Sequence, residues 1–62
     1  MVRALREAAG LSQRELAEEA GVSLRTIRYL ESRGVRNALV GTLEKVAGAL
    51  GVTILDLVSG GR

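Results

Sequence analysis

The chain contains no cysteine and no histidine. Disulfide bonds are therefore excluded, and the usual zinc sites lack their ligands. Tyr29 is the only aromatic residue, so any core must be built almost entirely from aliphatic side chains. No apolar run approaches the roughly 20 residues that span a bilayer, and charged residues interrupt the N-terminus where a signal peptide would lie. We therefore expect a soluble cytoplasmic protein that holds no metal or cofactor and has no evident small-molecule ligand.

The 62 residues are enough for one small domain, and 47% of them are hydrophobic. The net charge is only +2, but it is unevenly distributed. Residues 23–37 carry four arginines against Glu31 alone, a net charge of +3, whereas residues 12–22 carry Arg14 against three glutamates, a net charge of −2. The basic stretch suggests an anionic partner. The alternative is an ordinary solvated helix face.

A glycine, an apolar residue and a hydroxyl residue occur in that order three times, at residues 10–12, 21–23 and 51–53. Glycine readily adopts the left-handed conformation that ends a helix, and the apolar residue can pack back onto that helix. The hydroxyl then caps the next helix. Ser12 lies three residues before Glu15, and Thr53 three before Asp56, the spacing of a capping box. The three triplets predict three junctions between helices.

The apolar spacing between these junctions is helical, and no segment alternates with a period of two. We predict an all-α fold with helices at about 1–9, 12–20, 23–32, 39–50 and 53–59, in a domain of residues 1–59 followed by a tail at 60–62. The predicted core is aliphatic: Leu5, Leu16, Ala17, Ala20, Val22, Ile27, Leu30, Leu39, Leu43, Val46, Ala47, Leu50, Val52, Ile54 and Leu57.

Residues 13–31 resemble a known motif. The segment Gln13-Arg14-Glu15-Leu16-Ala17, followed by Gly21-Val22-Ser23, Ile27, Leu30 and Glu31, is similar to the helix-turn-helix of the lambda-repressor-like (Cro/XRE) DNA-binding family. Leu43, Ala47 and residues 50–58 resemble its last two helices. The resemblance implies a compact five-helix domain from a prokaryote or phage, associated with the nucleoid, with the helix-turn-helix at residues 13–32. One difference is that Ser32 and Arg33 both separate Glu31 from Gly34, where the family usually has one residue.

In this motif the second helix, here 23–32, lies in the major groove of DNA. The expected base contacts are Leu24, Arg25, Arg28 and Tyr29. Arginine can bond guanine bidentately, and an apolar side chain such as Leu24 can touch a thymine methyl. Leu24 could equally cap its own helix. Tyr29 could instead be partly buried with a hydrated hydroxyl.

The resemblance also assigns phosphate contacts and an ion pair. The expected phosphate contacts are Gln13, Ser23, Thr26, Arg33, Arg36 and Asn37; such contacts give affinity without sequence information. The family commonly joins the positions of Arg6 and Glu31 by a salt bridge, which would tie the first helix to the third. The alternative is that both charges are solvated.

We expect a homodimer on a palindromic operator, because one recognition helix reads too few base pairs to define a unique site. Val40, Leu55 and Val58 are apolar residues that a five-helix core does not need, so they are the predicted dimer contact. Single exposed aliphatic residues are also normal.

No catalytic set is visible, because the serines are accounted for as helix caps and the glycines are dispersed at helix ends. The leading hypothesis is a sequence-specific regulator of transcription, in the manner of a repressor. The alternatives are a protein-interaction module or an antitoxin with the same fold. An interaction module should present an apolar or acidic third helix, but residues 23–32 carry two arginines on the outward face.

Overall fold

The computed structural model describes residues 1–59, apart from the side chain of Ser59, and places them in five α-helices without a strand in that range. The helices are α1 (Val2–Ala8), α2 (Gln13–Ala20), α3 (Leu24–Arg33), α4 (Val40–Leu50) and α5 (Ile54–Ser59). The predicted all-α fold is confirmed, and each predicted boundary lies within two residues of the observed one. The expected tail at 60–62 lies outside the described residues.

The three glycine triplets form the junctions that their sequence predicts. At each, a backbone N–H bonds the carbonyl five residues earlier: Leu11 to Arg6, Val22 to Ala17 and Val52 to Ala47. This bond is the mark of a helix end closed by a left-handed residue. Gly21 and Gly51 supply that residue for α2 and α4, with φ of 71° and 72°. The chain reverses sharply there because no Cβ opposes the left-handed backbone.

The hydroxyl residues then start the following helices. Ser12 accepts from the Glu15 N–H at 3.0 Å, and the Glu15 carboxylate accepts from the Ser12 N–H at 2.8 Å, so the capping box is complete. Thr53 and Asp56 repeat the arrangement at α5 with distances of 3.2 and 3.0 Å. Three of the helix starts are thus specified by side chains within four residues of the cap.

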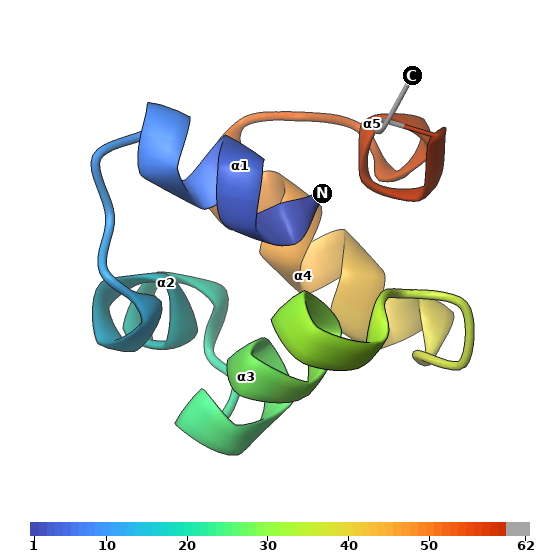
Figure 1. Cartoon of the computed structure of the whole chain (residues 1–62), viewed down its shortest axis with the longest axis horizontal. Coiled ribbons are helices and arrows are strands. Elements are labelled where there is room, and N and C mark those ends of the chain that lie inside the picture. Colours follow the sequence, from blue (N-terminus) through green and yellow to red (C-terminus); the bar gives the residue numbers. More distant parts are fainter. Residues whose placement is uncertain (60–62) are drawn as a thin grey trace.

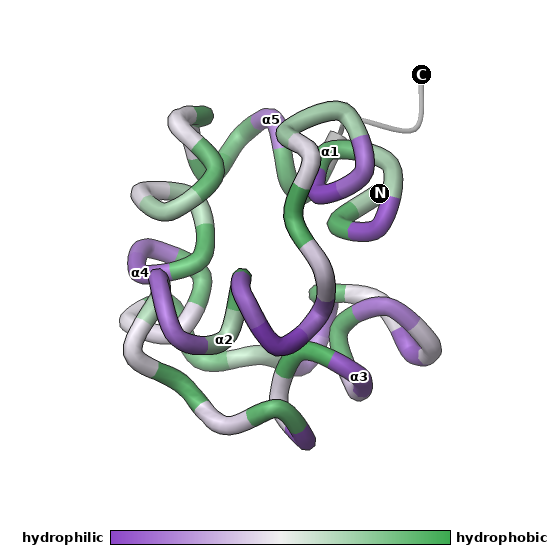
Figure 2. The backbone as a smooth tube through the Cα atoms, turned by 90° about the vertical axis from the view of Figure 1, so that its left-hand side faces the viewer, coloured by the Kyte–Doolittle hydropathy of each residue, from purple (hydrophilic) through white to green (hydrophobic). Residues whose placement is uncertain are grey.

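Helix α4 packs against α2 and α5, and α3 packs against α1 and α2 (Figure 1). Figure 2 shows purple and green alternating along α2 and α3, as expected of amphipathic helices. Leu16 of α2 and Ile27 of α3 are both fully buried in the core. Burial of such a side chain contributes about 1.5–3 kcal/mol. Within the described range, no helix has the length and apolar character needed to cross a membrane.

The core contains most of the predicted residues, with two differences. Val2 is fully buried, although the core expected from the sequence omitted it. Leu39 was placed in the core, and that prediction is wrong, because its side chain is 76% exposed. The helical spacing from Leu43 was extrapolated back by four residues, but α4 begins only at Val40 and Leu39 has extended backbone angles, φ −68° and ψ 144°. Its side chain therefore leaves the buried face of the helix.

The segment after α3 accommodates the additional residue noted in the sequence. Helix α3 continues through Ser32 and Arg33 and ends at Gly34, whose N–H bonds the Leu30 carbonyl at 3.1 Å. Both residues that separate Glu31 from Gly34 therefore lie in the helix, and the loop that follows occupies residues 34–39. Half-buried Val35 and Ala38 pack that loop against the core.

Candidate nucleic-acid interface

Helices α2 and α3 meet at a tight turn that leaves one side of α3 in solvent. Ala17, 5% exposed, is the small residue on α2 that lets helices approach closely, and Gly21 reverses the chain. Ile27 and Leu30 anchor the inner side of α3 in the core, with at most 2% of either exposed. The opposite side of α3 is consequently held outward, as a rigid surface whose orientation is set by the core.

The outward side of α3 carries cationic and aromatic side chains. Arg25 and Arg28 are exposed, and Tyr29 is 44% exposed. Leu24, at the first turn, is half-buried. The half-burial of Leu24 is compatible both with a cap on its own helix and with a base contact, and Tyr29 remains open enough to contact a ligand.

Two shallow grooves flank this side of α3. One lies between α3 and the start of α4 and is lined by Arg25, Thr26, Tyr29, Leu30, Ala38, Leu39 and Thr42. The other lies where α3 passes the starts of α1 and α2 and is lined by Arg3, Gln13, Arg28, Glu31 and Ser32. The structure therefore separates the two arginines that the sequence placed in one group, since Arg25 and Arg28 line different grooves.

The first turn of α3 is capped by a pair of hydroxyls. Ser23 Oγ accepts from the Thr26 N–H at 3.1 Å and lies 2.9 Å from Thr26 Oγ1. One hydroxyl donates to the other in this pair, so one hydroxyl proton is left for an acceptor outside the helix. Ser23 is exposed and Thr26 half-buried. The pair can therefore offer one hydrogen bond to an anion at the helix start.

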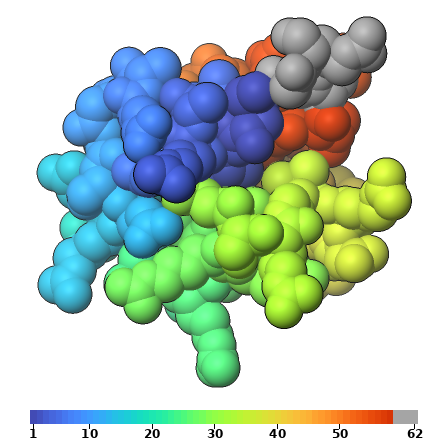
Figure 3. Space-filling view, in the orientation of Figure 1, coloured from blue at the N-terminus to red at the C-terminus, as the bar shows by residue number. Residues whose placement is uncertain are grey.

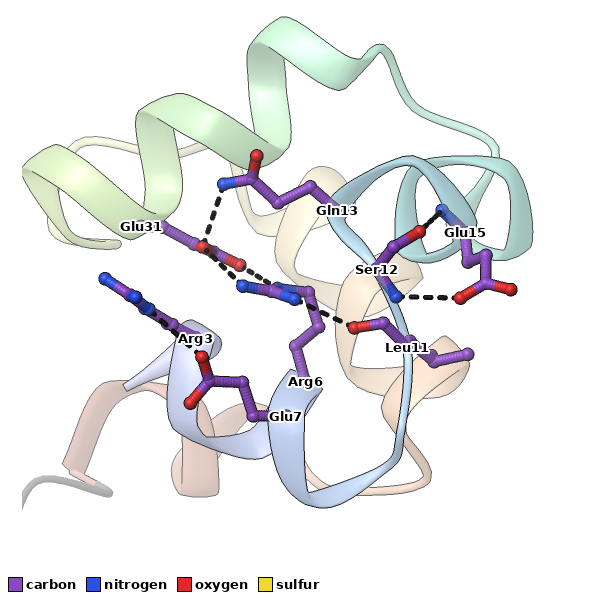
Figure 4. Close-up of polar contacts among 8 residues, drawn as sticks. All are labelled: Arg3, Arg6, Glu7, Leu11, Ser12, Gln13, Glu15 and Glu31. Atoms are coloured by element: carbon purple, nitrogen blue, oxygen red, sulfur yellow. Dashed lines mark hydrogen bonds and ion pairs between the residues drawn. The ribbon is translucent and has the colours of Figure 1, made fainter.

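The end of α3 is tied to α1 and α2 through Glu31 (Figure 4). Arg6 donates through Nε to Glu31 Oε2 and through Nη2 to Glu31 Oε1 at 3.2 Å, and its Nη1 donates to the Leu11 carbonyl at 2.8 Å. Gln13 Nε2 donates to Glu31 Oε1 at 3.0 Å. The side chains of Arg6 and Glu31 are only 11% and 6% exposed. One carboxylate thus holds three helices in register.

The network also changes the acidity of its members. Burial alone would raise the pKa of Glu31, but hydrogen bonds from Arg6 and Gln13, with the positive charge of Arg6, hold that pKa below its ordinary value of about 4.5. The hydrogen bond to Glu31 raises the pKa of Arg6. Both groups are therefore charged at neutral pH, and the pair is internally neutral.

The remaining residues expected at the interface are dispersed. Arg33 ends α3, and Arg36 and Asn37 lie in the loop after it; all three are exposed. The apolar residues expected at a dimer contact are also exposed, with Val40 at 64%, Leu55 at 67% and Val58 at 53%. They come from the start of α4 and from α5, which lie on the same side of the molecule in Figure 1.

A comparison with protein families identifies this arrangement. A helix-turn-helix family model matches residues 2–57, a range that includes α1 to α4 and most of α5. The chain belongs to this helix-turn-helix family. Its type is the Cro/C1-like, XRE-like one that the sequence resembled. No curated protein and no solved structure gives a significant match.

This helix-turn-helix protein is therefore a DNA-binding domain of the regulatory type, with α2 and α3 as the helix-turn-helix. The expected residues that the fold brings together are Gln13, Arg28 and Glu31 in one groove and Arg25, Thr26 and Tyr29 in the other. Arg36 and Asn37 line neither groove.

Sequence reasoning missed three residues that line these grooves, namely Arg3, Leu39 and Thr42. Arg3 lies in the groove with Gln13, although the sequence offered only its i, i+4 spacing to Glu7 as a signal. Leu39 and Thr42, from the start of α4, line the groove with Arg25. No spacing rule reveals such neighbours, because they come from elements separated by loops.

Proposed function

We propose that this protein is a sequence-specific regulator of transcription that reads an operator in double-stranded DNA by placing α3 in the major groove. The observation that carries the proposal is the two-sided character of α3. Its inner side is anchored by Ile27 and Leu30, and its outer side presents Arg25, Arg28 and Tyr29 to solvent. An α-helix of about 10–12 Å diameter matches a major groove about 12 Å wide.

Arg25 is the proposed principal base reader. It lies in the first turn of α3, the part of the recognition helix that approaches base edges in this motif. The guanidinium can donate two parallel hydrogen bonds to guanine O6 and N7. Tyr29 lies one turn later beside the same groove and offers a hydroxyl to a base edge or a phosphate. The sequence preference should accordingly be dominated by one guanine in each half-site.

The proposed backbone contacts lie around this reading surface. Arg33 and Arg36 are exposed cations at and beyond the end of α3, and Asn37 is an exposed amide in the same loop. Gln13 begins α2, and its amide nitrogen carries a second N–H besides the one donated to Glu31. Contacts of this kind position the protein on DNA and make binding salt-dependent.

The proposed active species is a symmetric homodimer that joins Val40, Leu55 and Val58 of each copy. All three side chains are apolar and more than half exposed, and exposed apolar side chains that lie together often mark a protein interface. Two copies related by a two-fold axis would read half-sites about 10–10.5 base pairs apart. We assign a repressor role because occupation of an operator suffices for repression, whereas activation requires a further contact with the polymerase.

Selection of bound duplexes from a random library tests this function, followed by gel-shift titration of the enriched sequence with and without about 200 mM added salt. The proposal expects an enriched inverted repeat and affinity that falls with salt for every duplex. If no sequence is enriched and no duplex shifts at low salt, the proposal is wrong, and a protein-interaction role for the same fold becomes the better account.

A further inference from the structure

One of the two grooves beside α3 is lined mainly by polar and charged side chains that the base-reading role of α3 leaves unexplained. These residues are Arg3, Gln13, Arg28, Glu31 and Ser32. It lies where the start of α1 and the start of α2 meet the flank of α3. Figure 3 shows the dark blue atoms of the beginning of α1 directly beside the green atoms of α3 on one face of the molecule. Three separate elements therefore supply polar side chains to one place.

The charges in this groove leave an excess of positive charge. The carboxylate of Glu31 is already bonded by Arg6 and Gln13, and its charge is balanced by Arg6. Arg3 contacts Glu7 at 3.3 Å, in an exposed pair that is 71% and 57% accessible. Within residues 1–59, no salt bridge involves Arg28. Arg28 therefore contributes a full positive charge, and Arg3 is held only by a weak surface pair.

The position of this groove on the flank of α3 determines which part of the DNA would lie against it. A helix that fills the major groove points its outermost side chains at base edges, whereas its flanks face the two sugar-phosphate backbones. Arg25 lies in the first turn of α3, and the N-terminal residues of a recognition helix approach base edges, whereas Arg28 lies about one turn further along the helix. Arg28 lies beside Arg3 of α1 and Gln13 of α2. These two residues are too far from the floor of the major groove to contact a base edge there.

We propose that this groove is a binding site for a single backbone phosphate of duplex DNA, clamped by Arg3 and Arg28, with the second amide N–H of Gln13 as a third donor. The proposal rests on the DNA-reading function of α3 and makes two assignments within it. Arg3 becomes a DNA contact, and Arg28 becomes a phosphate contact rather than a base reader.

Glu7 acts as a competitor in this scheme. Its carboxylate holds the guanidinium of Arg3 in the free protein, and the same guanidinium must turn to the phosphate in the complex. Removal of the Glu7 charge should therefore favour the bound state through Arg3. Because the pair is exposed, its loss has little effect on folding.

The test measures the affinity of Arg3→Ala, Arg28→Ala, the double variant and Glu7→Gln by fluorescence anisotropy. Each is titrated with the selected operator and with an unrelated duplex, at several salt concentrations between about 50 and 200 mM. Lys45→Ala is the matched control, because it removes one exposed positive charge from α4 outside both grooves.

Each single arginine variant should bind both duplexes more weakly by the same factor, so that the ratio of the two affinities is unchanged. The slope of log affinity against log salt should flatten by about one unit, which means that the defect shrinks about fourfold across this salt range. Glu7→Gln should tighten binding in the wild-type background and have no effect in the Arg3→Ala background.

A single neutral methylphosphonate, moved along each strand of the operator, then locates the contact. At one position, the methylphosphonate should make the wild type and both arginine variants bind with the same affinity. The proposal is overturned if Arg3→Ala behaves as Lys45→Ala does, or if Arg28→Ala loses discrimination between the two duplexes. Either result can occur while α3 still reads an operator, so this failure is distinct from failure of the proposed function, in which no duplex is preferred.

Discussion

Arg6 on α1 donates to both carboxylate oxygens of Glu31 on α3, a residue 25 positions away in the sequence. The two side chains are almost fully covered, and Gln13 adds a third donor to the same carboxylate. The contact joins the first helix to the end of the helix that carries the exposed arginines. Its value for function lies in the orientation of α3, since desolvation offsets much of what a buried ion pair contributes to stability.

Replacement of Glu31 by Gln should lower the free energy of unfolding at pH 7 by about 2–3 kcal/mol, because hydrogen bonds to a charged group are lost and Arg6 is left without its counter-charge. Urea titration followed by circular dichroism measures this change. Glu7→Gln, which disrupts an exposed pair, is the control and should cost less than about 1 kcal/mol. Equal effects of the two variants would contradict a structural role for the network.

The lowered pKa of Glu31 also predicts a pH dependence. A carboxylate whose pKa is lower in the folded state contributes stability that is complete above its unfolded value, about 4.5, and is lost as the pH falls through the folded value. The wild type should therefore lose stability between about pH 5 and pH 3 more steeply than Glu31→Gln. Urea melts at several pH values provide the comparison, and parallel curves for the two proteins would refute the assignment.

Arg25 and Arg36 should differ in what they contribute to DNA binding. Arg25→Ala should cost about 1–3 kcal/mol on the selected operator and relax the preference at one base pair, since a bidentate contact to guanine is lost. Arg36→Ala should weaken binding to operator and random duplex alike and flatten the salt slope by about one unit. Anisotropy titrations of both variants on both duplexes decide this. The proposed division is wrong if the two variants show the same pattern.

Leu55→Glu should weaken binding to the palindromic operator while leaving the helix content unchanged, because Leu55 is 67% exposed and a charge in the proposed dimer contact would be repelled by its symmetry mate. Sedimentation with operator DNA should give two wild-type chains per palindromic site. A saturating ratio of one chain per site would rule out the dimer. Glu44→Lys, at another exposed position on α4, tests whether any change of charge has this effect.

Substitutions of Gly48 and Gly51, near the end of α4, should change the stability of the protein in opposite directions. A Cβ added at either Gly48 or Gly51 would meet nothing within 4 Å, so packing does not distinguish them. Gly48 is inside the helix, and Gly48→Ala should stabilise the protein by about 1 kcal/mol. Gly51 has φ of +72°, and Gly51→Ala should destabilise it by about 1–2 kcal/mol. Thermal melts with opposite shifts are expected, and shifts of the same sign would contradict the backbone argument.

Leu39 occupies the N-cap of α4 without a capping side chain, in the extended conformation that Ser12 and Ser23 adopt at α2 and α3. Leu39→Ser should stabilise the protein by about 1 kcal/mol, because the hydroxyl can accept from an N–H of the first turn and little apolar contact is lost. Leu39→Ala provides the control, since alanine cannot cap. Chemical denaturation that gave both variants the same gain would argue against capping as the cause.

The sequence by itself determined the helices and their ends, because the responsible interactions are local. The bond from Val22 to Ala17 and the cap of Ser12 on Glu15 join residues three to five positions apart. Gly21 and Ser12 therefore predict these interactions from the sequence alone. The amphipathic spacing of Leu16 and Ile27 likewise selects the buried faces before any packing partner is known.

The tertiary structure alone decided which of these local elements meet. It buried Val2 of α1 in the core. It exposed Leu39 because the exact first residue of α4 sets the direction of the side chain before it. It also separated Arg25 from Arg28 and placed Arg3 beside the latter. That neighbourhood depends on how α1 and α2 cross α3, and the crossing is set jointly by core volume and by the Arg6–Glu31 pair. No spacing along the chain encodes such a meeting, since loops of different length could bring other residues to the same place.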